Sequence, residues 1–416
     1  MVFICVGLVL YVVLGGADFG APIWQVTAGR GSFGEKIREH AHKSMAPVWE
    51  ANHVWLIFVL TVLWTAYPVA FGSIASTLAV ALTAAAVGII VRGAAYAFRT
   101  GTRSARELRA IDMASAVSSV LAPFALGAAV GGIASGRVPV GNAAGNLWSS
   151  WLNPTSVAIG LIAVAASTYM AAVFLAADAR RAGDRELAEA FRTRALASGA
   201  VTGALALAGL VVLHEDAGRV YHRLIDGPGL PGLIVSIAAG LVTLALTLTR
   251  RHEPARYTAG LAVAGIVAGW ALAQRPEILP GLTVQQAAAP RSTQVAVIIA
   301  VVAGGAILFP SMALLFRLTL GGSLGEGGGA DAAGSAAGGR ARLLEASRRG
   351  LLARVAGALL IAGVGLVNVA DAEWAHVVGG LAFIGCIATG AVALAPLAAG
   401  AGEARPGPAE GGAAAD

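Results

Sequence analysis

Five ionisable side chains lie within or at the ends of apolar stretches in the first quarter of the chain: Asp18, Glu50, His53, Arg92 and Arg99. An ionisable group in a hydrocarbon environment costs at least a few kcal/mol, so each of them needs a functional or structural reason. Burial favours a neutral carboxyl group and a nearby guanidinium favours a carboxylate, and this balance allows proton exchange near neutral pH. We therefore predict a proton pathway that contains Asp18, Glu50 and His53.

Glu50 and His53 belong to the segment WEANHVWL, which opens a long apolar stretch. Their spacing of three residues places both side chains on one face of a helix. A structural interpretation of Glu50 also stands, because an acid in the first turn of a helix interacts favourably with the helix dipole and could pair with Arg92 or Arg99. That interpretation does not explain Asp18, which comes from another helix.

The other members of this cluster indicate a structural motif. Tryptophan rings are common at membrane interfaces, which is the structural interpretation of Trp49 and Trp55. We predict a structural or ion-pair role for Trp49, Asn52, Trp55, Arg92 and Arg99.

Metal or haem binding by this chain is not predicted. One His and two carboxylates on different helices form no recognisable ligand spacing. A bis-His haem site needs two histidines at matching depth, and among the 7 histidines His214 and His376 could pair in this way near the outer side. Both are also ordinary interfacial residues. Cys5 and Cys386 fall inside apolar stretches and are interpreted as small buried side chains.

The composition is that of a membrane protein. Hydrophobic residues make up 57% of the chain and charged residues 12%, and the mean hydropathy is +0.75, which excludes an ordinary soluble domain. A helix crosses the bilayer with about 20 apolar residues, and a strand-like alternation is absent. The sequence predicts an all-α polytopic protein with about nine core transmembrane helices and two extra C-terminal ones. The expected spans are 1–24, 48–71, 74–98, 112–133, 155–177, 196–214, 229–249, 257–274, 292–316, 351–370 and 374–398.

Most of the 29 Lys and Arg residues fall in every second loop between these spans. The positive-inside rule then predicts that these loops are cytoplasmic, with the N-terminus outside and the C-terminus in the cytoplasm. The net charge of +6 is therefore assigned to topology and not to a nucleic-acid partner. In this topology the first three spans bring Asp18, Glu50 and Arg92 to a similar depth near the cytoplasmic side.

Four parts are predicted along the chain. Residues 1–320 form a membrane domain, and the Gly/Ala-rich stretch GGSLGEGGGADAAGSAAGG opens a cytoplasmic linker with a basic end at 321–349. Residues 350–400 form an additional two-helix membrane segment. Residues 401–416 are expected to be a disordered tail.

Several stretches resemble subunit II of cytochrome bd-type quinol oxidases. VLGGADFGAP, APVWEANHVWLIFVLTVLWTAYPVAFG and VRGAAYAFR are similar to its first three helices, and PVWEANHVWL is closer to the cyanide-insensitive branch. The segments WLNPTSVAIGLIAVAASTYMAAVFLAAD, LPGLTVQQAAAPRSTQ and ILFPSMALLFRL extend the similarity to about residue 318. The last two expected spans have no counterpart in this resemblance.

The resemblance implies a haem-free subunit, inactive alone, of a quinol:oxygen oxidoreductase in the bacterial plasma membrane. Its partner would be the haem-bearing subunit I, with two haems b and haem d, which oxidises quinol and reduces dioxygen to water with cytoplasmic protons. Glu50 would stand at the position of an acid on the proton path, and Asp18 at that of the first-helix acid. Trp49 and Arg99 would match packing and ion-pair positions. A small accessory subunit, membrane lipid and a structural quinone are further partners that it allows.

A proton-coupled secondary transporter is the alternative function. In that case Asp18, Glu50 and Arg92 would bind a proton and an ionic substrate. Transporter sites lie near the middle of the membrane, whereas these side chains are expected at its inner edge. Their depth favours the oxidase subunit.

Overall fold

The computed structural model describes residues 1–45, 49–102 and 104–320, with scattered single residues between 355 and 389. The chain divides into two units, Met1–Val302 and Ala303–Asp416, and the first of them contains the candidate site. The predicted linker, the two additional spans and the tail lie outside the described residues, apart from those isolated positions.

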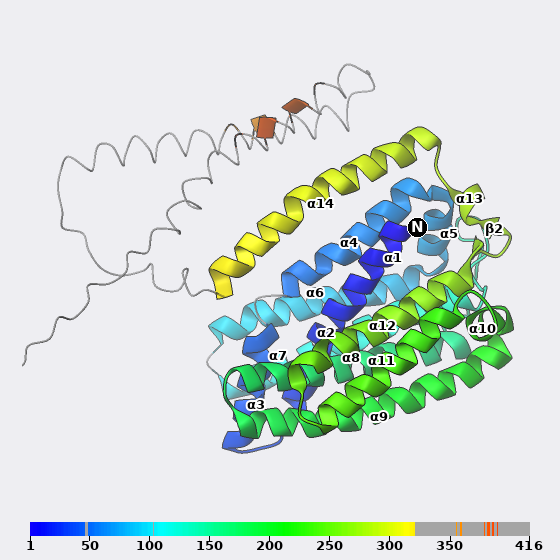
Figure 1. The fold of residues 1–416 in the computed structure, drawn as a ribbon. Coiled ribbons are helices and arrows are strands. Elements are labelled where there is room, and N and C mark those ends of the chain that lie inside the picture. Colours follow the sequence, from blue (N-terminus) through cyan, green and yellow to red (C-terminus); the bar gives the residue numbers. More distant parts are fainter. Residues whose placement is uncertain are drawn as a thin grey trace, which may run out of the picture. The chain divides into compact units, whose positions relative to one another are not determined.

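Apart from one short hairpin, the described part of the chain is built from helices, which confirms the all-α fold (Figure 1). Seven apolar helical stretches have the length and composition to cross a membrane, and α4 and α14 contribute the shorter apolar stretches Asn52–Ala66 and Arg291–Ala306. The prediction of a polytopic membrane protein is therefore confirmed, while its helix number stays a prediction. The elements are α1 (Val2–Leu10), the π-helix η1 (Tyr11–Gly15), α2 (Gly16–Val26), α3 (Ser32–Met45), α4 (Trp49–Ala66), α5 (Pro68–Thr77), α6 (Ala79–Gly101), α7 (Ala105–Ala134), α8 (Pro154–Arg181), α9 (Arg185–Asp216), α10 (Gly218–Ile225), α11 (Leu230–Leu248), α12 (His252–Gln274), β1 (Glu277–Leu279), β2 (Leu282–Thr283), α13 (Val284–Ala287) and α14 (Arg291–Leu320).

Pro68 interrupts the second expected span. Helix α4 ends at Ala66, and α5 begins at Pro68, because proline has no N–H to donate to the preceding turn and its fixed φ suits the first position of a helix. The stretch 48–71 is consequently two helices and not one continuous span.

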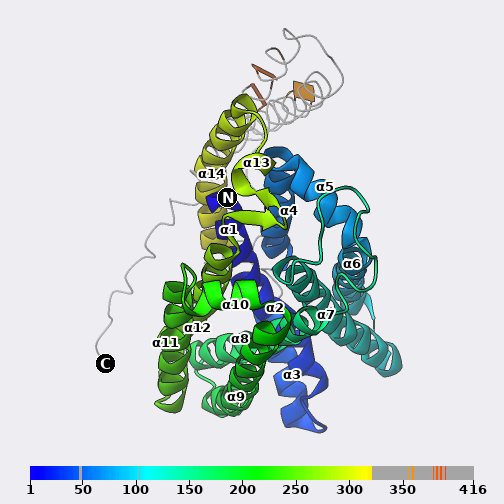
Figure 2. The ribbon, with the colours of Figure 1, turned by 90° about the vertical axis from the view of Figure 1, so that its right-hand side faces the viewer.

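The loops gather at two opposite ends of the first unit. Helix α3 and the α8–α9 turn lie at one end, whereas α5, α10 and the antiparallel β1–β2 hairpin lie at the other (Figures 1 and 2). Ion pairs join loops within each end. At the α3 end they are Lys36–Asp184, Arg181–Glu253 and Arg250–Glu189, and at the other end Arg137–Asp216 and Arg219–Glu277. The two ends thus correspond to the alternating loops of the predicted topology, and which end faces the cytoplasm remains a prediction.

Helix α3 covers the ends of α2, α8 and α9. Its apolar side chains Ile37 and Ala41 are buried against Ala21, Leu175 and Phe191, and its opposite face carries Lys and Glu. This amphipathic pattern explains a helix that lies across the ends of the spans. The segment lies between the first two expected spans, where a loop was predicted.

A close approach of α2 and α8 positions the first span. A Cβ atom at Gly20 would lie 2.6 Å from the Cβ of Ala171, so only glycine allows the two helices to pack here. Gly20 is two residues after Asp18, and this contact therefore holds the segment that carries the acid.

Candidate functional site

Asp18 and Arg92 form a buried ion pair between α2 and α6. Arg92 Nη2 donates to Asp18 Oδ1 over 2.5 Å, and the guanidinium lies 5.2 Å from the centre of the Phe19 ring. Asp18 is 1% exposed and Arg92 is 7% exposed. Each charge compensates the other in a place where an isolated charge would be costly.

Pro22 explains a second contact of Arg92. A helical carbonyl normally accepts from the N–H four residues later, but the residue four positions after Asp18 is Pro22, which has no N–H. Arg92 Nη2 donates to the Asp18 carbonyl instead, over 3.0 Å. The proline thus creates a backbone acceptor beside the carboxylate, and both bind the same guanidinium.

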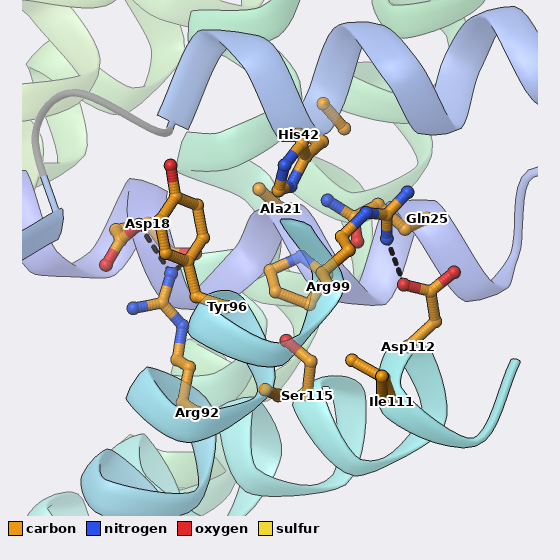
Figure 3. Close-up of a pocket in the computed structure, with 13 residues that line it drawn as sticks. Asp18, Ala21, Gln25, His42, Arg92, Tyr96, Arg99, Ile111, Asp112 and Ser115 are labelled. Carbon is orange, nitrogen blue, oxygen red and sulfur yellow. Dashed lines mark hydrogen bonds and ion pairs between the residues drawn. The ribbon is translucent and has the colours of Figure 1, made fainter. Parts of the chain in front are cut away.

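A cavity of about 40 Å³ runs beside this pair between α2, α3, α6 and α7. A water molecule needs roughly 10–15 Å³ of space for its centre, so the cavity has room for water. Figure 3 shows the side chains around it. Its polar and charged lining includes Asp18, Gln25, His42, Arg92, Arg99 and Asp112.

The cavity extends from the buried ion pair towards the α3 end. Arg99 forms a second ion pair with Asp112 (Figure 3). Arg99 follows Arg92 by two helical turns of α6, which corresponds to about 10 Å along the helix axis. The side chains of Arg99 and Asp112 are 20% and 16% exposed, against 9% and 2% for Arg92 and Asp18. The exposure of the lining side chains therefore increases along the cavity, from the buried Asp18–Arg92 pair to the face that carries α3.

His42 lines the cavity from α3. Its ring lies 5.4 Å from that of Tyr96, and burial lowers its pKa, an effect to which the charge of Arg99 adds and which that of Asp112 opposes. His42 is therefore neutral at pH 7, with one ring nitrogen able to donate a hydrogen bond and the other able to accept one. A neutral imidazole beside a water-sized cavity can take up and release protons.

His53 lies deeper, in an aromatic cluster with the first span. Its ring centre is 5.9 Å from that of Phe19 and 6.1 Å from that of Tyr11. Asn52, next to it on α4, donates to the carbonyl of Leu14 within the π-helix over 3.2 Å. These contacts fasten the first turns of α4 to the segment that carries Asp18.

The predicted site residues fall into two groups. Asp18, Arg92, His53 and Asn52 come together around the junction of the first span with α4 and α6, and Arg99 lies farther along the cavity. Arg92 pairs with Asp18 and Arg99 with Asp112. The expected structural alternative, in which one of these arginines pairs with Glu50, concerns a side chain that lies outside the described ones.

Of the two tryptophans of the motif, the structure describes the side chain of Trp55 but not that of Trp49. Trp55 is 8% exposed and belongs to a core cluster with Tyr11, Phe19 and Ala122, which is a packing position in the helix bundle; its role as an interfacial anchor stays a prediction. Trp49 and Glu50 begin α4, and their side chains lie outside the described ones.

Several members of the site were not predicted from the sequence. Asp112 is the first residue of the expected span 112–133, and Gln25 and His42 fall between the first two expected spans. The proline four residues after Asp18 was a readable signal, because it predicts a free carbonyl beside the acid. No sequence pattern that we used predicts the π-helix Tyr11–Gly15.

No group of three or more His, Cys, Asp or Glu side chains suited to a metal ion occurs among the residues that the structure describes. His214 contacts Tyr221 and His222, with ring centres 4.7 Å and 6.1 Å apart. His376 lies outside the described residues, so the pairing of these two histidines stays untested.

Comparisons with known proteins place the chain in a family. The model of the family described as cytochrome bd terminal oxidase subunit II matches residues 1–319. Cytochrome bd-I ubiquinol oxidase subunit 2 of Escherichia coli K12 is 27% identical over 236 residues, which cover 54% of this chain and 59% of the relative. The proteins of the same name from the O6:H1 and O157:H7 strains match equally well. The aligned part thus spans about three fifths of the length of these relatives.

A solved structure shares the fold. The structure of bd oxidase from Geobacillus thermodenitrificans matches with a TM-score of 0.59 and 23% identity, over 77% of this chain and 99% of the solved chain. The family match extends over more than half of the chain and includes every residue of the cavity. This chain belongs to the cytochrome bd terminal oxidase subunit II family.

Proposed function

We propose that the chain is the haem-free subunit II of a membrane quinol:oxygen oxidoreductase of the cytochrome bd type. It would support a haem-bearing subunit I, which holds two haems b and haem d, and it would be inactive alone. Membership of the subunit II family supports this assignment, and it does not favour the transporter alternative. The haems would supply the electron transfer and oxygen chemistry in the partner, and quinol would be the substrate of the complex.

The role specific to this chain is the uptake of protons for the reduction of dioxygen to water. The observation that carries this proposal is the cavity that leads from the α3 end to the buried Asp18–Arg92 pair. Basic loops at that end make it the cytoplasmic face in the predicted topology. Protons would enter at His42 and the Arg99–Asp112 pair, pass through water in the cavity and reach Asp18.

The environment of Asp18 suits a group that binds and releases protons. Burial disfavours the charged carboxylate, whereas Arg92 favours it. Among the described residues Asp18 Oδ2 has no hydrogen-bond partner, which leaves this oxygen available for a proton or a water molecule. Glu50 and His53, on the first turns of α4, are proposed as the next acceptors towards the partner subunit.

Replacing Asp18 by Asn tests this role. The amide keeps the size of the side chain and can accept from Arg92, but it cannot carry a proton, so quinol-dependent oxygen consumption should fall at least about tenfold. Glu39→Gln is the matched control, because Glu39 is an exposed acid on α3 whose described partner is Lys43 on the same helix. Haem content of the purified complex should stay at the parental level in both variants. Parental turnover of Asp18→Asn would reject the proposed role.

A further inference from the structure

Tyr11 carries a buried hydroxyl group that makes no hydrogen bond within the described part of the chain. The residue is 5% exposed, and among the described residues its hydroxyl oxygen has no hydrogen-bond partner. Buried hydroxyl groups are normally paired, because their desolvation is costly. Phenylalanine would fill the same space without this cost, so the hydroxyl calls for another explanation.

The π-helix Tyr11–Gly15 brings Tyr11 into line with Phe19. Residues seven apart share a face of a regular α-helix, whereas residues eight apart are rotated by about 80°. A π-turn takes up one additional residue, and Tyr11 and Phe19, eight apart, consequently lie together with ring centres 6.5 Å apart. Without the π-turn the Tyr11 ring would point away from this cluster.

The position of Tyr11 continues the line of the cavity beyond Asp18. Tyr11 precedes Asp18 by seven residues, which places it about two turns, or roughly 10 Å, farther from the α3 end. The Phe19 ring, which lies 6.5 Å from the ring of Tyr11, also lies 5.2 Å from the guanidinium of Arg92. On its other side the ring lies 6.1 Å from that of His53, one helical turn after Glu50.

From this geometry we propose that the Tyr11 hydroxyl group carries protons from Asp18 towards His53 on α4. The hydroxyl oxygen accepts a proton from the Asp18 side through water and releases its own proton towards α4. Tyr11 is unchanged after the transfer, and no other reactant is needed. This inference rests on the proposed role of Asp18 in proton uptake.

Tyr11→Phe in the complete complex tests the relay. The substitution removes one oxygen atom and keeps the contacts of the ring with Phe19 and Trp55. Haem content should be unchanged, oxygen consumption should fall about tenfold, and the rate ratio between H₂O and D₂O should increase because proton transfer becomes limiting. Tyr257→Phe is the control, since Tyr257 is 70% exposed on α12 and its loss should leave all three quantities unchanged.

Asp18→Asn measured in parallel separates the two proposals. A slow Asp18→Asn complex together with parental rates and a parental D₂O ratio for Tyr11→Phe would overturn the relay and leave the proposed function intact. Parental rates for both variants would overturn both. Loss of haem from Tyr11→Phe would assign Tyr11 a packing role and would also overturn the relay.

Discussion

Replacing Arg92 by Gln should destabilise the protein through the acid that it leaves behind. The substitution removes the 2.5 Å contact with the Asp18 carboxylate, the 3.0 Å hydrogen bond to the Asp18 carbonyl and the contact with the Phe19 ring. Removal of one member of a buried ion pair costs about 3–5 kcal/mol when the remaining charge stays unpaired. Asp18 can lower this cost by binding a proton, but its carbonyl still loses a partner.

A double-mutant cycle separates the pair from its surroundings. Asp18→Asn alone leaves the buried guanidinium of Arg92 without its carboxylate, whereas Asp18→Asn with Arg92→Gln leaves no buried charge at this place. The destabilisation of the double variant should therefore be smaller than the sum of the single ones by about 2–3 kcal/mol. This difference is the coupling energy between the two side chains.

The free energy of unfolding can be measured by titrating the purified complex with denaturing detergent in mixed micelles. The control cycle uses Glu39→Gln and Lys43→Gln, an exposed pair on α3 with a 2.6 Å contact, for which a coupling energy of no more than about 0.5 kcal/mol is expected. If the effects of Asp18→Asn and Arg92→Gln simply add, the two side chains do not form the buried pair that we describe.

Three further outcomes follow from the site. Glu50→Gln should lower quinol-dependent oxygen consumption without loss of haem, and Glu50→Asp should keep part of the activity; normal turnover of Glu50→Gln in an oxygen-electrode assay would reject its role. Pro22→Ala should not lower the free energy of unfolding, yet it should slow oxygen consumption, because the new N–H competes with Arg92 for the Asp18 carbonyl; an unchanged rate would contradict this. Burial lowers the pKa of His42 in the folded chain, so the unfolded chain binds this proton first and the free energy of unfolding should decrease as the pH falls below about 6.5. Unfolding titrations of His42→Gln between neutral and mildly acidic pH should show a smaller decrease, and an identical pH dependence would contradict the assignment.

The sequence predicted the relative depth of the charged residues because this depth follows from the number of residues along each span. An apolar helix rises about 1.5 Å per residue and successive spans alternate in direction, so Asp18 and Arg92 were expected at one level, where the structure places them. The partner of each arginine side chain could not be predicted from such a count. It depends on the rotation of each helix and on Pro22, and the structure pairs Arg99 with Asp112.

Features that depend on tertiary packing were also missed. The burial of Trp55 follows from its contacts with the first span, since the same ring at another rotation of α4 would face lipid. The π-helix at Tyr11–Gly15 has no recognised sequence pattern, and the β1–β2 hairpin is too short to stand out in a sequence dominated by apolar helices. Helix α3 was overlooked because its amphipathic pattern lies between two spans that were identified by hydropathy alone.

The central claim is that protons enter this chain at the α3 end and reach Asp18. It is tested most directly by proton uptake during a single turnover, measured with a pH-indicating dye on the α3 side of vesicles that contain the complete complex. The Asp18→Asn complex should take up protons at least about tenfold more slowly than the parental and Glu39→Gln complexes after oxygen is added. Uptake at the parental rate in Asp18→Asn would contradict the claim.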